Sequence, residues 1–267
     1  MSILNKVEFL DRNTEGRDFV VGDLHGCFDE LMDMLEKIGF DKSVDRLLSV
    51  GDLVDRGPKN MECANLVWED WVKAVRGNHE DMMIHTVLDN DQNAKDTWLW
   101  NGGLWSAGYH ETELQIAAQR LNQLPLVIVV GQGTEDRFNI VHADLMHSSY
   151  LDENNVLVTD LEIDQWAFAA HEEDNMIWGR NIINGSRDLQ DPDHLSITYV
   201  GHTPVNKVVR VQQQVYLDTG AVFYHVGQQA SEARALTMAC PTDGNLYSYN
   251  MMHKTVTVSL LADIERL

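Results

Sequence analysis

The sequence predicts a mixed α/β fold in which a central β-sandwich is flanked by helices. Residues 18–78 alternate short apolar runs with segments of helical spacing, a pattern typical of strands joined by crossover helices. Residues 207–260 show short alternating runs, which are typical of antiparallel strands. No linker-like composition interrupts the chain, so we expect one domain over residues 1–267.

The first eighty residues predict three parallel strands. Residues 18–22 and 47–50 are apolar runs that each lead to an aspartate, and 72–75 is a third run. Between them, residues 28–38 place apolar side chains at helical spacing, and 59–68 indicates a second helix. Such crossover units give parallel strands, and ligands bind at the carboxyl ends of parallel strands.

The rest of the chain predicts helices and further strands. We expect the last five runs to form an antiparallel sheet. The expected helices cover 80–124 and 160–172, the expected strands 126–130, 138–141 and 197–200, and the final runs 207–211, 214–218, 233–240, 244–250 and 255–260. We expect Trp98, Trp100 and Trp105 to lie in the core of the first helical segment, with a weaker hypothesis that one of them lines the substrate cleft.

Charge and cysteine content narrow the function classes. The formal charge of −22 disfavours binding to nucleic acid and to anionic membrane surfaces. The three cysteines are too few and too scattered for a disulfide framework. No signal-peptide pattern and no apolar stretch of about 20 residues is visible. We therefore expect a cytoplasmic protein, and a monomer, although the sequence does not fix the oligomeric state.

Five short motifs place metal-binding side chains where strands should end. Any one of them alone is commonly a capped turn or a structural histidine. Together, and in this order, they form a ligand set for two metal ions. The motifs are Gly-Asp-Leu-His-Gly at 22–26, Gly-Asp-Leu-Val-Asp-Arg-Gly at 51–57, Arg-Gly-Asn-His-Glu at 76–80, Val-His-Ala-Asp at 141–144 and Gly-His-Thr-Pro at 201–204.

The ligand types predict a dinuclear hydrolase site. Carboxylate, imidazole and amide ligands favour Mn²⁺, Fe²⁺ or Zn²⁺ over Ca²⁺ or Mg²⁺. A water shared between two such ions becomes a nucleophile near neutral pH. We expect one ion at Asp23 and His25, a second at Asn78, His142 and His202, and Asp52 between the two.

Neighbouring side chains in these motifs suggest how a phosphate ester is handled. Arg56 and Arg76 can supply bidentate contacts to phosphate. His79 follows a predicted ligand and can protonate a leaving alkoxide. Asp55 can orient His79 and raise its pKa.

These motifs closely resemble the bacterial and phage branch of the phosphoprotein phosphatase family of metallophosphoesterases, typified by lambda phage protein phosphatase. The firm match covers about residues 19–223. The resemblance implies a calcineurin-like metallophosphoesterase fold, Mn²⁺ as a good metal and phosphoserine or phosphothreonine as substrate, with phosphotyrosine and phosphohistidine as further candidates. It also implies that Arg180, in Ile-Trp-Gly-Arg at 177–180, is a third phosphate-binding arginine.

The main alternative is a dinucleoside polyphosphate hydrolase of the same fold. Those enzymes resemble Gly-Asp-Leu-Val-Ala-Arg-Gly at the second motif, so Asp55, together with Glu80 and Thr203, favours the protein phosphatase. A DNA nuclease is disfavoured by the charge and by Gly-His-Thr-Pro at the last motif. A non-catalytic scaffold should have lost a ligand or the acid, and none is missing.

Overall fold

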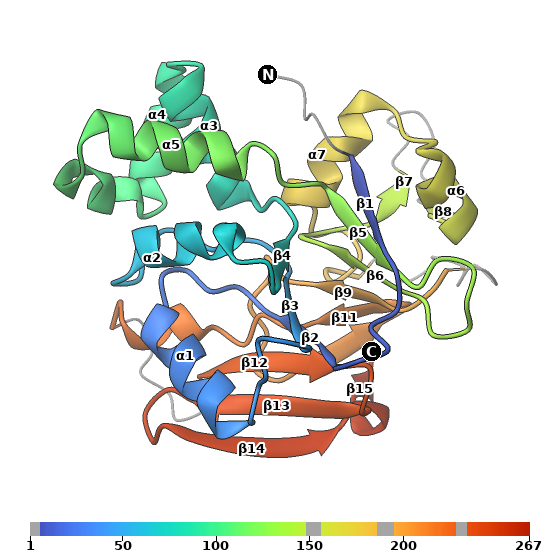
Figure 1. The fold of residues 1–267 in the computed structure, drawn as a ribbon. Helices are drawn as coiled ribbons and strands as arrows, with labels where there is room; N and C mark the ends of the chain where they lie inside the picture. Colours follow the sequence, from blue (N-terminus) through green and yellow to red (C-terminus); the bar gives the residue numbers. More distant parts are fainter. Residues whose placement is uncertain (1–5, 148–155, 186–194, 228–233) are drawn as a thin grey trace.

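The computed structural model describes residues 6–147, 156–185, 195–227 and 234–267. Two mixed sheets pack face to face, and helices cover their outer faces (Figure 1). The predicted α/β sandwich is therefore confirmed. None of the described helices combines the length and apolar composition that a membrane crossing requires.

The six-stranded sheet carries the predicted crossover units. Its strand order is β14-β13-β12-β2-β3-β4. As expected, β2, β3 and β4 are parallel, whereas β12, β13 and β14 add antiparallel strands beyond β2. The strands are β2 Asp18–Val21, β3 Arg46–Ser49, β4 Val72–Ala74, β12 Ala235–Cys240, β13 Asn245–Asn250 and β14 Thr255–Leu260.

The seven-stranded sheet has the order β1-β5-β6-β9-β11-β10-β15. Its edge strands were not expected from the sequence: β1 pairs in parallel with β5, and β15 with β10. The strands are β1 Val7–Leu10, β5 Val127–Val130, β6 Phe138–Val141, β9 Thr198–Val200, β10 Val209–Val211, β11 Gln214–Tyr216 and β15 Glu265–Arg266. A separate small sheet joins β7 Met146–His147 to β8 Val156–Leu157.

Two groups of helices cover the sandwich. The first group packs on the six-stranded sheet in one core, and the second packs on the seven-stranded sheet in another. The first comprises α1 Phe28–Lys37, α2 Asn60–Asn65, α3 Asn78–Leu88, α4 Gln92–Trp100 and α5 Glu111–Leu121, with 3₁₀ turns η1 Leu66–Trp68 and η2 Gly103–Gly108. The second comprises α6 Asp160–Gln165 and α7 Ala170–Trp178; the 3₁₀ turns η3 Ala221–Tyr224 and η4 Leu261–Asp263 occur later.

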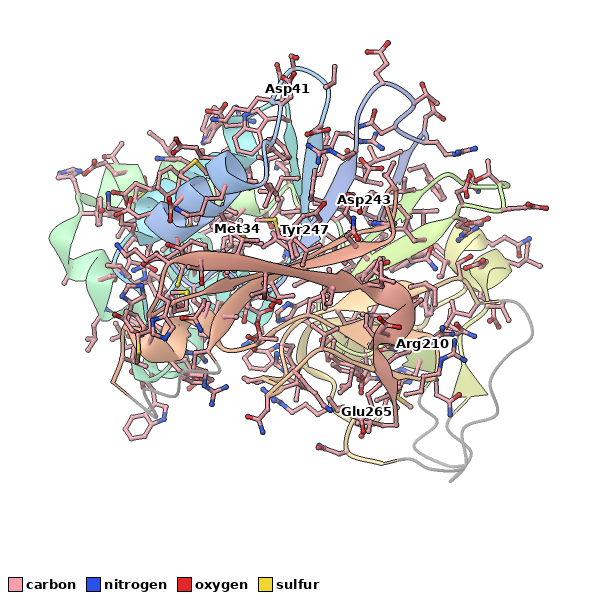
Figure 2. All side chains as sticks on the ribbon, turned by 90° about the horizontal axis from the view of Figure 1, so that it is seen from below. Met34, Asp41, Arg210, Asp243, Tyr247 and Glu265 are labelled. Atoms are coloured by element: carbon pink, nitrogen blue, oxygen red, sulfur yellow. The ribbon has the colours of Figure 1, made fainter. Side chains whose placement is uncertain are left out.

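Helix α1 shows how local sequence and packing agree. Its apolar side chains Leu31, Met34 and Leu35 are buried against the sheet. Acidic residues occupy its first turn, where their negative charge interacts favourably with the helix dipole and stabilises the helix. Met34 belongs to the same core as Tyr247 of β13, and both side chains lie between helix and sheet (Figure 2). Each fully buried apolar side chain of this size contributes about 1.5–3 kcal/mol.

Two expectations about the elements are wrong. The predicted helix over 160–172 is broken, because Trp166 adopts a left-handed conformation (φ 48°) that ends α6. The alternating runs after residue 207 do not form one antiparallel sheet. Strands β10 and β11 join the seven-stranded sheet, and β12 to β14 join the other. Alternation specifies which side chains are buried but not which sheet receives a strand.

Candidate active site

The predicted ligands converge where the two sheets meet. Loops after β2, β3 and β4 carry four of them, and loops after β6 and β9 carry one histidine each. Possible ligand atoms of His25, Asp52 and His79 lie within 4.8 Å of one another, as do those of Asp52, His142 and His202. Asp52 belongs to both groups, which agrees with its predicted place between two ions.

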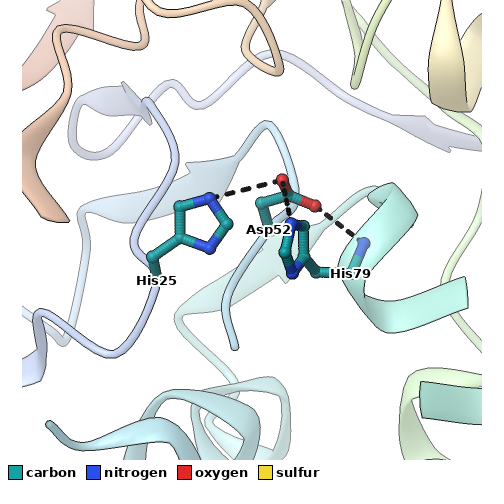
Figure 3. A group of neighbouring side chains, drawn as sticks. All are labelled: His25, Asp52 and His79. Carbon is teal, nitrogen blue, oxygen red and sulfur yellow. Dashed lines mark hydrogen bonds and ion pairs between the residues drawn. The ribbon is translucent and has the colours of Figure 1, made fainter. Parts of the chain in front are cut away.

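Asp52 lies at the centre of the cluster. One carboxylate oxygen lies 3.5 Å from His25 Nε2, and the other lies 3.4 Å from His142 Nε2 and accepts the His79 backbone N–H at 3.0 Å. Figure 3 shows His25 and His79 on either side of this carboxylate. Burial alone would raise the pKa of Asp52, but the neighbouring His142 and His79 lower it far below its ordinary value. Asp52 is thus held as an anion.

Two histidines, His25 and His142, are fixed so that Nε2 of each ring faces the centre. His25 and His142 donate from Nδ1 to the carbonyls of Val54 and Val50, both at 2.8 Å. A carbonyl only accepts, so Nε2 of each neutral ring carries a lone pair. Burial lowers the pKa of His25 and His142, and it lowers that of His202 to about 3. These lowered pKa values favour the neutral form of each ring, which is the form that binds metal.

Two features of the site are explained by a bound cation. His142 Nε2, a lone-pair nitrogen, lies 2.9 Å from Asn78 Oδ1, which is also an acceptor. Nε2 of His202 is buried and has no hydrogen-bond partner among the described residues. A buried acceptor left in this way costs about 1–3 kcal/mol. The donor set therefore fits divalent ions.

The environment of Asp23 is a further indication that a cation binds at this site. It is buried, and its pKa is raised well above the ordinary value by burial and by the carboxylates of Asp218 and Asp52. A cation would offset this repulsion. Both oxygens of Asp23 accept the His202 N–H, at 3.2 and 3.1 Å. A Cβ on Gly201 would lie 1.9 Å from Asp23 Oδ1, which explains the glycine there.

The site loops have an unusual backbone. Five residues other than glycine have positive φ angles, in the left-handed region that L-residues rarely adopt. This conformation directs their side chains toward the centre of the site or its rim. The residues are His25 (42°), Asp52 (50°), Asp55 (77°), Arg56 (69°) and His202 (64°).

Glu80 holds these loops together, a role that the sequence did not reveal. Its fully buried carboxylate accepts the backbone N–H groups of Asp52, Leu53 and Gly77 at 2.8–2.9 Å. Burial and the charge of Asp52 raise the pKa of Glu80 to about 7. The only sequence signal was its place inside the third motif.

His79 and Asp55 form the predicted pair. His79 Nδ1 lies 2.6 Å from Asp55 Oδ2, and Nε2 of His79 has no hydrogen-bond partner in the part of the chain that the structure describes. Burial alone would lower the pKa of His79, but Asp52 and Asp55 outweigh it and raise the pKa. Trp98 and Trp105 also donate from Nε1 to Asp55, at 3.0 and 2.6 Å. The sequence predicts these tryptophans as core residues, or one of them as a lining of the cleft, but not as hydrogen-bond donors to Asp55.

A cavity of about 650 Å³ opens over this centre, and two of the three predicted arginines line it. Arg56 donates to His25 Nε2 at 2.7 Å, and Arg180 to Thr203 Oγ1 at 3.2 Å. Arg76 is not among the described residues that line the cavity. Its side chain is 1 % exposed and donates to the carbonyl and side-chain oxygens of Asn122. The structure therefore does not bring Arg76 to the phosphate position.

Comparison with known proteins points to the same chemistry. Residues 19–210 match the family model described as calcineurin-like phosphoesterase. Serine/threonine-protein phosphatases 1 and 2 of Salmonella typhimurium are 36 % and 32 % identical to this chain, over 81 % and 76 % of it and 90 % and 87 % of their own lengths.

Two further similarities are more limited. A symmetrical bis(5'-nucleosyl)-tetraphosphatase of Pasteurella multocida is 49 % identical, but over only 26 % of each chain. A protein serine/threonine phosphatase from Saccharomyces cerevisiae with similarity to human phosphatase PP5 has the same fold, with a TM-score of 0.56 at 16 % identity over 98 % of this chain and 84 % of that one. The family match spans most of the chain and includes every predicted metal ligand, and the chain therefore belongs to the calcineurin-like phosphoesterase family.

Proposed function

We propose that this protein is a metal-dependent phosphoprotein phosphatase that hydrolyses phosphomonoesters of serine and threonine. The observation that carries the proposal is the buried cluster around Asp52, in which neutral imidazoles and carboxylates converge beneath a cavity lined by two arginines. Bacterial relatives that match over most of their length are named serine/threonine-protein phosphatases, which supports the substrate class.

In the proposed arrangement, the cluster would hold two divalent ions. Asp23 and His25 would hold the first, Asn78, His142 and His202 would hold the second, and Asp52 would be shared. The ions supply a nucleophile from water near neutral pH and neutralise charge on the phosphate. Mn²⁺, Fe²⁺ and Zn²⁺ are the candidate metals, because the ligands mix nitrogen and oxygen, and the family resemblance favours Mn²⁺ among them.

The protein's own side chains bind and protonate the substrate. Arg56 and Arg180 hold the phosphate oxygens from two sides of the motif cluster. His79, aligned by Asp55, donates a proton from Nε2 to the leaving oxygen. Arg76 acts indirectly, by tying the loop after β4 to the end of α5.

The cellular setting is also inferred. Cys27, Cys63 and Cys240 are free and buried, which suits a reducing compartment such as the cytoplasm. The absence of nucleic-acid and membrane partners, suggested by the charge of −22, and the monomeric state stay predictions.

Dinucleoside polyphosphate hydrolysis is the second candidate, because a symmetrical bis(5'-nucleosyl)-tetraphosphatase is 49 % identical to this chain over 26 % of each. A side-by-side assay separates the two. Initial rates would be compared on phosphoserine and phosphothreonine peptides and on diadenosine tetraphosphate at equal enzyme and Mn²⁺. Faster turnover of diadenosine tetraphosphate would refute the proposal.

The metal requirement is tested with chelated protein and with Asp52→Asn. Chelated protein should be inactive and recover with Mn²⁺, and Asp52→Asn should lose about 10³-fold in kcat. Asp29→Asn, an exposed aspartate of α1, is the matched control and should retain activity. Activity that survives both chelation and Asp52→Asn would rule out the two-metal site.

A further inference from the structure

Residues 98–105 span the end of α4 and the start of η2. Three of them form hydrogen bonds to Asp55 or Arg56. Trp98 and Trp105 donate to Asp55, and the Gly102 carbonyl accepts the Arg56 N–H at 3.4 Å. Gly102 has φ 114°, and its Cα lies so close to Arg56 that a Cβ would meet the arginine side chain at 2.8 Å. These contacts fix the segment against the residues that bind and protonate the substrate.

Two other residues of the same segment are apolar and exposed. Trp100 is 91 % exposed and Leu104 is 69 % exposed, although both line the active-site cavity with His79 and Arg180. They therefore contribute little to the core. Large apolar side chains gathered in the open beside a polar centre are typical of a binding surface.

Other elements extend this apolar surface. Trp178, at the end of α7, and Phe223 and Val226, in and after η3, line the same cavity. Trp178 and Val226 are also exposed. We call the five side chains Trp100, Leu104, Trp178, Phe223 and Val226 the apolar rim. The apolar rim does not serve to bind the phosphate group, because phosphate is held by charge and hydrogen bonds.

We propose that the apolar rim is a substrate subsite that binds an apolar side chain within two residues of the phosphorylated residue of a protein substrate. This inference rests on the proposed function and names a preference within it. Burying such a side chain against Trp100 and Leu104 removes apolar area of both partners from water. The net charge of −22 repels acidic side chains, so it disfavours substrates with acidic residues next to the phosphorylated residue.

Charge in the cavity favours a peptide over a dinucleotide as the occupant. Aromatic side chains can also stack on nucleotide bases. However, among the described lining residues, only Arg56 and Arg180 carry a permanent positive charge. Outside the proposed metal centre, two arginines suit one phosphomonoester, whereas the further phosphates of a tetraphosphate chain would bring more negative charge into a strongly acidic protein.

The test compares phosphoserine peptides that differ at one position. Leucine or glycine is placed at each of the two positions before and after phosphoserine, and kcat/KM is measured with the Mn²⁺-loaded protein. We expect leucine to raise kcat/KM at least about tenfold over glycine at one or more positions. Trp100→Ala should reduce that ratio toward one, with the change in KM rather than in kcat. Leu161→Ala, an exposed leucine of α6 outside the cavity lining, is the control and should keep the ratio.

The outcomes separate this inference from the proposed function. Equal kcat/KM for leucine and glycine peptides, with both hydrolysed, overturns the apolar rim as a subsite and leaves the phosphatase assignment intact. Failure to hydrolyse any phosphopeptide, with diadenosine tetraphosphate hydrolysed, overturns the proposed function itself. Loss of diadenosine tetraphosphate hydrolysis in Trp100→Ala without loss of the peptide ratio makes the rim a base-stacking surface instead.

Discussion

The two sheets contribute to the site in different ways. The six-stranded sheet supplies Asp23, His25, Asp52 and Asn78 from loops after three parallel strands that follow one another in sequence. The seven-stranded sheet supplies single histidines, His142 and His202, after strands far apart in the chain. The ligands of the six-stranded sheet are brought together by local sequence, whereas the histidines of the seven-stranded sheet reach the site because the two sheets pack together.

The largest loss of activity should come from replacing a candidate metal ligand, one from each sheet in turn. We expect His25→Ala and His142→Ala each to retain one ion per chain instead of two and to lose about 10²–10³-fold in kcat, since both ions act on the phosphate. Atomic absorption and steady-state rates measure this. His85→Ala, a partly exposed histidine of α3 bonded to Asp89, is the control. Two ions in either ligand variant would refute the assignment of that histidine.

A second, smaller effect should separate catalysis from metal binding within the six-stranded half. We expect Asp55→Asn to keep both ions and to lose about 10²-fold in kcat on alkyl phosphates, because His79 is no longer held as an acid. The loss on p-nitrophenyl phosphate should be smaller, since nitrophenolate leaves without a proton. Trp105→Phe removes one of the bonds to Asp55 and should cause a weaker loss of the same kind. Equal losses on both substrates would contradict an acid role.

The arginines give a third contrast, between stability and binding. Arg76→Met removes charged hydrogen bonds to Asn122 and should lower stability by about 3 kcal/mol, which is on the order of 5–10 °C in Tm, with KM unchanged. Arg56→Met should raise KM and leave Tm nearly unchanged, because Arg56 faces the cavity. Thermal unfolding and kinetics on one phosphopeptide measure both. A raised KM in Arg76→Met at unchanged Tm would restore the role that the sequence suggested.

The smallest effect concerns the end of β3 away from the site. Burial would raise the pKa of Asp45, but bonds from Arg17 and from backbone N–H groups outweigh it and hold this pKa below its ordinary value. The stabilisation is therefore present above the unfolded pKa and is lost as pH falls through the folded pKa. We expect wild type to lose about 1 kcal/mol more than Asp45→Asn between pH 5 and pH 3 in urea unfolding. Identical losses would show that Asp45 does not carry this linkage.

What the sequence could predict follows the same division. The positions of Asp23, Asp52 and Asn78 after β2, β3 and β4 could be predicted, because each follows a short apolar run at a crossover spacing and strand ends of this kind are visible locally. The orientation of the Arg76 side chain could not be predicted, because it depends on a hydrogen bond to Asn122 at the end of α5. Nor were the bonds from Trp98 and Trp105 to Asp55 predicted, since a tryptophan at helical spacing looks the same whether its N–H is free or used. Trp100 was expected in the core and is exposed instead.

The five left-handed residues of the site have a consequence for engineering. Each such conformation costs a residue other than glycine about 1–2 kcal/mol, so His25, Asp52, Asp55, Arg56 and His202 together cost on the order of 5 kcal/mol or more. That is comparable with the whole stability of a small protein. Glycine at any of these positions would relax the backbone and remove a working side chain. A search for thermostable variants should therefore find inactive ones at these loops, and active ones only among substitutions in the outer helices and strands.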